Sequence, residues 1–257
     1  MNALSEWTLT ENARRDWNSL AEHYQIFREK PGTYNELVEV PAMLNLIGDV
    51  KEKKVLDAGC GYGFYSLLLA KKGAIVTGID ISEKNIELAK KNASECSIKC
   101  ESIVCDMQDL SIFQSETFDL VTSSIVVNYL DDLKKAFLEV FRVIKLQGIF
   151  TFSENHPILK GKWETDSEGR RLHWNLDNYF ERSIIIDKWR TQSGGIIETR
   201  SQHRTIQDYF DALISAGFTV ERLVEPKPIE TSIDSKKDRY ERAKRIPYFI
   251  LFKERKP

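Results

Sequence analysis

The sequence predicts an α/β fold in which a mostly parallel β-sheet is covered on both faces by helices. Short apolar runs alternate with helical patterns from residue 53 onward, which is typical of parallel strands joined by helices. Glycines cluster where the first of these runs meets a helix. The chain has 257 residues, 42% of them hydrophobic and 30% charged, so it is long enough for one such domain with an insertion.

The chain opens with two predicted helices. Residues 11–29 repeat apolar side chains at intervals of three and four, the spacing of one helical face. These side chains are Trp17, Leu20, Ala21, Tyr24 and Phe27. A second helix is expected over 34–48.

The core of the chain predicts five strands before the pattern changes. The expected strands are 53–59, 74–80, 101–106, 118–124 and 148–155. The first is followed by a helix that Gly73 ends, and the second by a helix that Ser82 caps. Between the last two, an apolar stripe from Leu130 to Ile144 predicts an amphipathic helix.

An insertion interrupts the alternation from His156 to about Gln202. Within it, two β-type runs flank Gly194 and Gly195 and predict a hairpin. A helix from Ile206, ended by Gly217, and strands over 219–226 and 248–254 complete a set of seven strands. The polar segment 227–247 is expected on the surface, and its basic run, 235–245, contains enough acidic residues to favour a solvated helix.

Charge and composition narrow the functional classes. The formal net charge is -2 and the pI about 6.2, so the overall charge does not favour binding of nucleic acid. No apolar run could span a membrane and the first residues lack a signal peptide, which favours a cytoplasmic protein. The four cysteines match no zinc spacing, so we expect reduced thiols and no metal site.

The stretch "GCGYGF" is the strongest local signal. A dinucleotide fingerprint requires glycines in the pattern GxGxxG after a strand. Here Gly59, Gly61 and Gly63 are present, and Phe64 stands where the last dinucleotide glycine belongs. Asp57 precedes the turn, where a carboxylate disfavours a phosphate and suits an ammonium group.

Acidic residues at the ends of the next two strands complete the expected ligand. Asp80 is placed to accept hydrogen bonds from ribose hydroxyls, and Ile81 offers an apolar face to a purine. Asp106 could accept from an exocyclic amine, with the backbone of Met107 at the ring edge. The implied ligand is an adenosine with a cationic amino-acid tail and no phosphate.

These segments, taken in order, resemble a known enzyme family. "VLDAGCGYG", "GIDIS", "CDMQDL", "FDLVTSSIVVNYLDDL" and "EVFRVIKLQGIFTFSENHP" are similar to successive motifs of class I S-adenosylmethionine-dependent methyltransferases. The similarity is greatest to the small-molecule branch that includes the ubiquinone and menaquinone biosynthesis type. It implies a Rossmann-like sheet of seven strands, mostly parallel with the last antiparallel, and a lid inserted after the fifth strand.

The resemblance implies a methionine site formed by the glycine turn. Carried over residue by residue, Asp57, Gly59, Gly61 and Gly63 would contact the methionine part of S-adenosylmethionine. Ser123, after the fourth strand, matches a position whose backbone lies near the methyl donor.

The same resemblance assigns the rest of the cofactor. Asp80 would bind the ribose, and Ile81, Asp106 and Met107 the adenine. Tyr24 lies on a first helix similar to the one that closes over the cofactor in this family, although Gln25 replaces the aspartate that often follows that tyrosine.

Methyl transfer from a sulfonium needs alignment of the acceptor more than a catalytic triad. His156, directly after the fifth strand, is a candidate base; it could equally fix the turn before Pro157. Glu154 and Asn155 are similarly placed. The aromatic side chains of the insertion could line an acceptor pocket or form the insertion's own small core.

We therefore expect three parts: residues 1–50 as helices covering the cofactor, 51–156 with 203–257 as the methyltransferase core, and 157–202 as a substrate lid. The expected partner is a small-molecule substrate, with no nucleic acid and no membrane, in a monomer or homodimer. Alternatives are an RNA or protein methyltransferase, a nicotinamide-dependent oxidoreductase, or a cofactor-binding protein without turnover. The sequence does not identify the acceptor.

Overall fold

A seven-stranded sheet organises the molecule, as the sequence predicts. The structure adds the strand order, which is β10-β11-β5-β4-β1-β2-β3. The computed structural model describes residues 7–191, 194–230 and 237–257. The strands are β1 (Lys54–Ala58), β2 (Ile75–Asp80), β3 (Glu101–Val104), β4 (Phe118–Ser124), β5 (Ile144–Asn155), β10 (Thr219–Val224) and β11 (Phe249–Arg255). Neighbouring strands from β3 to β5 are parallel, and β11 is antiparallel to both β5 and β10.

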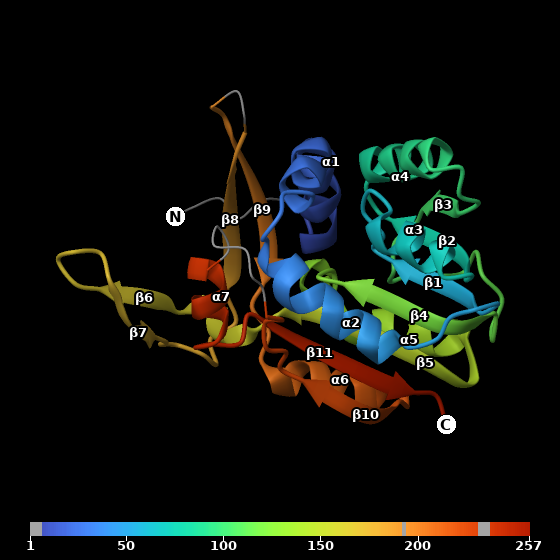
Figure 1. The fold of residues 1–257 in the computed structure, drawn as a ribbon. Helices are drawn as coiled ribbons and strands as arrows, with labels where there is room; N and C mark the ends of the chain where they lie inside the picture. The colour runs from blue at the N-terminus through green and yellow to red at the C-terminus, as the bar shows by residue number, and fades with distance from the viewer. Residues whose placement is uncertain (1–6, 192–193, 231–236) are drawn as a thin grey trace.

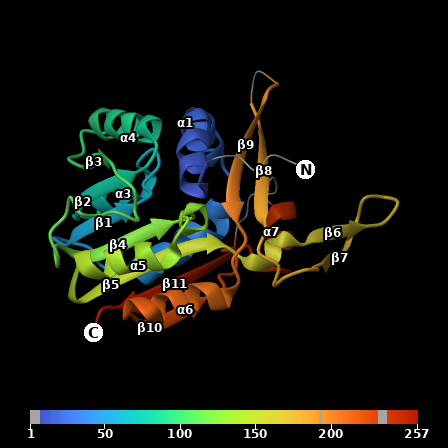
Figure 2. The ribbon, with the colours of Figure 1, turned by 180° about the vertical axis from the view of Figure 1, so that it is seen from behind.

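Helices cover both faces of this sheet (Figures 1 and 2). They are α1 (Leu9–Arg28), α2 (Val40–Ile47), α3 (Phe64–Lys71), α4 (Glu83–Glu95), α5 (Leu133–Val143), α6 (Ile206–Ala216) and α7 (Lys237–Ala243), with the short turns η1 (Asn35–Glu39), η2 (Val127–Tyr129) and η3 (Pro157–Lys160). Apolar residues of α2, α3 and η1 pack on one face, and those of α5 and α6 pack on the other. In the second core, Phe152 and Phe252 stack with ring centroids 4.7 Å apart.

Local side-chain caps explain where the helices begin. Thr8 and Glu11 form a capping box at the start of α1, and the Ser82 side chain accepts a hydrogen bond from the backbone of Asn85. The stripe that predicted one helix up to Ile144 is cut short, because Asp132 caps α5. Leu130 therefore precedes the helix, and the strand that was expected from residue 148 starts at Ile144.

The second predicted helix divides into two types of helix. The expected continuous element over 34–48 is a π-helix, η1, followed by α2. Pro41 lies in the first turn of α2 and has no N–H to continue the preceding hydrogen-bond ladder. The backbone N–H of Val40 reaches back to the carbonyl of Asn35, which is the wide spacing of a π-turn.

The π-helix ends at Glu39, a fully buried carboxylate that ties several elements together. Its Oε1 accepts hydrogen bonds from Ser124 (2.9 Å) and Ser153 (2.7 Å), and its Oε2 accepts one from the Tyr65 hydroxyl (2.8 Å). The guanidinium of Arg28, at the end of α1, lies 3.5 Å from Oε2. Glu39 therefore connects α1 to α3, β4 and β5.

The insertion after β5 forms two separate hairpins. β8 (Ile184–Arg190) pairs with β9 (Ile196–Gln202), which confirms the expected hairpin. β6 (Lys162–Thr165) pairs with β7 (Arg171–Asn175), a hairpin that the sequence reading missed. Figures 1 and 2 show β8 and β9 beside α1, whereas β6 and β7 project away from the core.

The polar segment before β11 is expected on the surface. Its described part includes α7, where most side chains are exposed and only Ala243 is buried. Residues 231–236, including the start of the basic run, lie outside the described residues.

Candidate active site

A cleft lies at the carboxyl ends of the parallel strands, beneath α1. Its walls come from the glycine turn, the ends of β2, β3 and β4, the turn η2, and one face of α1. The lining residues are Thr10, Ala13, Trp17, Tyr24, Gly59, Gly61, Asp80, Ile81, Asn85, Cys105, Asp106, Met107, Ser124, Ile125, Val126, Tyr129 and Leu130. Ligands of open α/β sheets bind at this edge, because the strand order reverses there.

The glycine turn is shaped by a close contact with Val126, in the loop between β4 and η2. Gly59 has φ +78°, and a Cβ added to it would meet Cγ2 of Val126 at 2.3 Å. Gly61 also has positive φ, with nothing within 4 Å of an added Cβ. Glycine is therefore required at 59 by both conformation and space, while at 61 it leaves the backbone open.

Asp80 holds this turn against the end of β2. Its Oδ2 accepts a hydrogen bond from the backbone N–H of Gly61 (2.9 Å), and its Oδ1 accepts from the backbone of Ser82 (2.9 Å) and the side chain of Asn85 (3.3 Å). Burial raises the pKa of Asp80, and the two backbone hydrogen bonds oppose that shift. Oδ1 already accepts two hydrogen bonds, whereas Oδ2 accepts one and keeps a further lone pair for a ligand hydroxyl.

The backbone N–H groups of the glycine turn are already used within the protein. Those of Gly59 and Cys60 donate to the carbonyl of Ile79 at 2.7 and 2.8 Å, and that of Gly63 donates to the carbonyl of Cys60. With Gly61 bound to Asp80, these four donors cannot cradle a phosphate. This arrangement disfavours the pyrophosphate of a dinucleotide.

The charged side chains that line the cleft are all acidic. Asp80 and Asp106 are acidic, and no lysine, arginine or histidine is among the lining residues. A negative ligand would find no countercharge there. An adenosine with a cationic tail fits these donors and charges, as the sequence suggested.

Asp106 is held in place from α1. Its carboxylate accepts hydrogen bonds from the backbone (2.8 Å) and side chain of Gln108, whose amide also donates to Thr10 at 3.0 Å. Ile81, Met107 and Asp106 line the same end of the cleft. These three, with Asp80 and the first two glycines, come together as the sequence reading expected.

Three of the residues assigned to the methionine site do not line the cleft. Asp57 is 1% exposed, and its Oδ2 accepts a hydrogen bond of 2.6 Å from Ser66. Gly63 is the N-cap of α3. Ser123 is buried and donates to the carbonyl of Ala58 (2.8 Å), so its neighbour Ser124 is the one that faces the cleft.

Asp57 lies under the turn as a buried carboxylate whose side-chain hydrogen bond comes from the uncharged hydroxyl of Ser66. Burial raises its pKa to about 7, with the nearby Asp80 carboxylate adding to the shift and the Ser66 hydrogen bond opposing it. A cation brought close to Asp57 would favour its ionised form.

His156 does not line the cleft, and both of its ring nitrogens have partners elsewhere. Nδ1 accepts from the backbone of Ile158 at 3.2 Å, and Nε2 lies 2.9 Å from Oε1 of Glu225. Burial lowers the pKa of His156, although Glu225 opposes the shift. These contacts match the second of the two roles considered for it, fixing the turn that begins at Pro157.

Glu154, also considered for the acceptor side, is fully buried at the end of β5. Its Oε1 accepts a hydrogen bond from the backbone of Asn128 (3.1 Å), while Oε2 has no hydrogen-bond partner among the described residues. Burial raises the pKa of Glu154 to about 7, and the buried guanidinium of Arg204 opposes that shift.

Aromatic rings from three elements close the cleft. Tyr24 of α1 packs edge-on against Trp17 (centroids 5.0 Å apart) and against Trp189 of β8 (5.6 Å), and Trp17 packs against Tyr129 (5.5 Å). Tyr24 is thus at the cleft, as predicted from the first helix. Trp17 and Tyr129 were not assigned to the site, although Trp17 shares the helical stripe of Tyr24.

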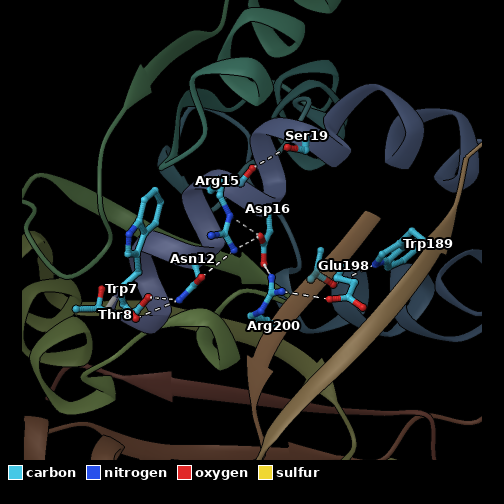
Figure 3. A network of polar contacts seen from close by, with 10 residues as sticks. Trp7, Thr8, Asn12, Arg15, Asp16, Ser19, Trp189, Glu198 and Arg200 are labelled. Atoms are coloured by element: carbon cyan, nitrogen blue, oxygen red, sulfur yellow. Dashed lines mark hydrogen bonds and ion pairs between the residues drawn. The ribbon is translucent and has the colours of Figure 1, made fainter. Parts of the chain in front are cut away.

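An ion pair fastens α1 to the hairpin that carries Trp189. Nη1 of Arg200 lies 2.8 Å from Oδ2 of Asp16, and Arg15 contacts the other oxygen of Asp16 (Figure 3). Asp16 is only 5% exposed and Arg200 28%. Together with the ring contacts, this pair makes α1 and the β8–β9 hairpin one cover.

Comparison with known proteins identifies similar chains. Residues 56–152 match the family model described as a methyltransferase domain. A Haemophilus influenzae protein described only as uncharacterized is 30% identical over 220 residues, which span 82% of this chain and 85% of that protein. The ubiquinone biosynthesis O-methyltransferase of Bordetella avium is 32% identical over 108 residues, 42% of this chain and 45% of that enzyme.

A solved structure agrees with these similarities. The S-adenosylmethionine dependent methyltransferase from Mesorhizobium loti superposes with a TM-score of 0.68 at 29% identity, covering 84% of this chain and 97% of that one. Among the described residues, no helix is both long and apolar enough to cross a membrane. Nor do three or more His, Cys, Asp or Glu side chains gather into a metal-binding group in the described ranges.

Proposed function

Since the chain belongs to the class I S-adenosylmethionine-dependent methyltransferases, we propose that it transfers a methyl group to a small-molecule acceptor. The observation that carries this proposal is the cover over the cleft. Four residues of α1, namely Thr10, Ala13, Trp17 and Tyr24, line the cleft directly. A covered cleft of this kind admits a small acceptor more readily than a folded macromolecule.

Residues of the cleft are proposed to hold the methyl donor in three places. Asp80 accepts from the ribose hydroxyls, and Ile81, Asp106 and Met107 contact the adenine. The open backbone at Gly61 and the rim at Ser124 take the methionine part. When bound, S-adenosylmethionine supplies a methyl group on a positively charged sulfur, which is an activated leaving group.

Asp57 is proposed to act from below the glycine turn. Its carboxylate is buried next to the turn but does not line the cleft, so its influence on the donor is electrostatic. Gly63 and Ser123 are proposed to act indirectly: Gly63 is the N-cap of α3, and the Ser123 hydroxyl donates to the carbonyl of Ala58 at the end of β1. The remaining task of the protein is to align the acceptor and exclude water.

The three-part division is retained as a proposal, with one refinement. Residues 1–50 cover the donor, and 51–156 with 203–257 form the core. Within 157–202, the β8–β9 hairpin is the part proposed as the substrate lid, because Trp189 and Arg200 contact α1. The β6–β7 hairpin projects away from the seven-stranded sheet (Figure 1), and none of its residues lines the cleft.

Methyl transfer to RNA or protein is the main alternative, and a labelling experiment separates the two. The purified protein is incubated with a cell extract and S-adenosylmethionine labelled in the methyl group, and the products are divided by ultrafiltration. We expect the label in the low-molecular-weight filtrate. Label retained with protein or RNA, and removed by protease or ribonuclease, would contradict the proposal.

A further inference from the structure

We infer that Gln108 is a positioning residue that couples binding of the methyl donor at Asp106 to the seating of α1 over the cleft. Gln108 does not line the cleft and is only 6% exposed. The inference rests on the donor site proposed above and adds a link between that site and its cover. It follows from the hydrogen bonds of the Gln108 side chain and from the way in which the first turn of α1 is held.

The side chain of Gln108 contacts three segments that are far apart in the sequence or in different elements. Its amide nitrogen donates to Oγ1 of Thr10 in α1 (3.0 Å) and to Oδ2 of Asp106, after β3 (3.2 Å). Its amide oxygen accepts from the backbone N–H of Asp132, the N-cap of α5, at 2.7 Å. Both polar atoms of the amide are therefore engaged, and the three neighbours together fix its orientation.

The first turn of α1 is docked on the same place through its own backbone. The N–H groups of Leu9 and Thr10 donate to the carboxylate of Asp131 at 2.7 and 3.1 Å. The backbone N–H of Asp131 in turn donates to Oγ1 of Thr10 (3.2 Å). A helix begins with N–H groups that lack partners within the helix, so this carboxylate supplies part of what the first turn needs. Oγ1 of Thr10 thus receives hydrogen bonds from both Asp131 and Gln108.

Gln108 therefore joins two residues that face the ligand. Thr10 and Asp106 both line the cleft, one from the cover and one from the end of the sheet. Asp106 is the residue proposed to accept from the adenine, so a bound donor restrains its carboxylate. The restrained carboxylate holds the Gln108 amide, and the amide holds Thr10 with the first turn of α1. By linkage, a seated α1 strengthens donor binding by the same factor.

The ion pair between Asp16 and Arg200 offers a matched control. It anchors the same helix, but it ties α1 to the β8–β9 hairpin instead of to the donor site. Loss of Arg200 should therefore loosen α1 and leave the connection through Gln108 intact.

Calorimetry with S-adenosylhomocysteine tests the coupling through a double-mutant cycle. Gln108→Met keeps the length of the side chain without its hydrogen bonds, and Thr10→Val keeps the shape without the hydroxyl. We expect each single variant to bind about tenfold more weakly than the wild type, and the double variant to lose no more than the weaker single variant. Unchanged affinity in Gln108→Met, or losses that multiply in the double variant, would overturn the inference.

Hydrogen exchange in α1 gives a readout that a purely structural role would not change. In the wild type, saturating S-adenosylhomocysteine should slow exchange in the first turn of α1 about tenfold, and in Gln108→Met by less than about twofold. Arg200→Met should retain the slowing seen in the wild type. Equal slowing in Gln108→Met and the wild type would overturn the inference.

Titration of the wild type with S-adenosylhomocysteine separates the two proposals. If the wild type does not bind it, the methyltransferase function is contradicted. If the wild type binds it and the losses of the two single variants multiply, only the role of Gln108 is contradicted.

Discussion

The backbone N–H of Gly61 donates a 2.9 Å hydrogen bond to the Asp80 carboxylate, which links the glycine turn to the end of β2. The residue expected to bind the ribose therefore also shapes the turn expected to hold the methionine. The backbone N–H groups of the turn donate to Asp80 and to the carbonyl of Ile79, so they are not available to a phosphate. The turn therefore suits a ligand that has no phosphate group.

Gly59→Ala should be among the most damaging single substitutions in the turn. Its added Cβ would meet Val126 at 2.3 Å, and φ +78° is strained for alanine. Together these effects predict a loss of about 3 kcal/mol in the free energy of unfolding. Urea denaturation measures it.

Gly169→Ala is the matched control for this prediction. It has the same φ of +78° but no atom within 4 Å of an added Cβ, so only about 1 kcal/mol should be lost. Adding Val126→Ala to Gly59→Ala should recover part of the stability. Equal losses in the two glycine variants would argue against the close contact as the cause.

The ion pair between Asp16 and Arg200 should couple α1 to the hairpin. A double-mutant cycle of Asp16→Ala and Arg200→Ala should give an interaction energy of about 1 kcal/mol, because Asp16 is largely buried. The exposed pair Asp166–Arg170 serves as the control and should give about 0.3 kcal/mol. If the interaction energy of Asp16 and Arg200 is no larger than that of the exposed pair, the ion pair does not couple α1 to the β8–β9 hairpin.

Glu39→Gln should destabilise the fold strongly. It removes the charge that faces the buried guanidinium of Arg28 while keeping the size of the side chain. Leaving one buried charge unpaired predicts a loss of about 3 to 5 kcal/mol in urea denaturation. Adding Arg28→Met should restore part of that loss, and a double variant less stable than Glu39→Gln would show that the pair is not the cause.

Asp57 should make the stability of the free protein fall as pH rises. Its pKa is about 7 in the folded state and about 3.9 in an unfolded chain, so the folded state binds the proton more tightly. Its contribution is full below about pH 4 and is lost by about pH 7, at up to about 1.4 kcal/mol per pH unit.

Urea denaturation of wild type and Asp57→Asn across pH 4 to 8 isolates this contribution. Glu154 has a similarly raised pKa and gives the wild type a slope of the same sign, so the difference between the two proteins is the relevant quantity. Asparagine can still accept from Ser66, which keeps the local hydrogen bond. Parallel pH profiles for the two proteins would exclude Asp57 as the source.

Much of this architecture could be read from sequence because it depends on local patterns. The strand ends that carry Asp80, Ile81, Asp106 and Met107 are fixed by apolar runs and by Ser82, a helix cap. Parallel strands then bring those ends to one edge of the sheet without any long-range information. These residues accordingly line one cleft.

Other features of the site and the fold depend on tertiary contacts, which local sequence patterns do not reveal. The choice between Ser123 and Ser124 follows from the pleat of β4, and the partner of His156, Glu225, comes from a distant segment. The β6–β7 hairpin has mostly exposed side chains, so its strands lack the buried alternation that marks a strand. Tyr129 lines the cleft from η2, a short turn that the sequence reading did not predict.

Binding of S-adenosylhomocysteine and NADH, measured by calorimetry on wild type and Asp80→Ala, tests the account most directly. We predict one S-adenosylhomocysteine site per chain, weakened about a hundredfold in Asp80→Ala by the loss of the charge-assisted hydrogen bond to the ribose, and no binding of NADH. Tight binding of NADH, or unchanged affinity for S-adenosylhomocysteine in Asp80→Ala, would contradict it.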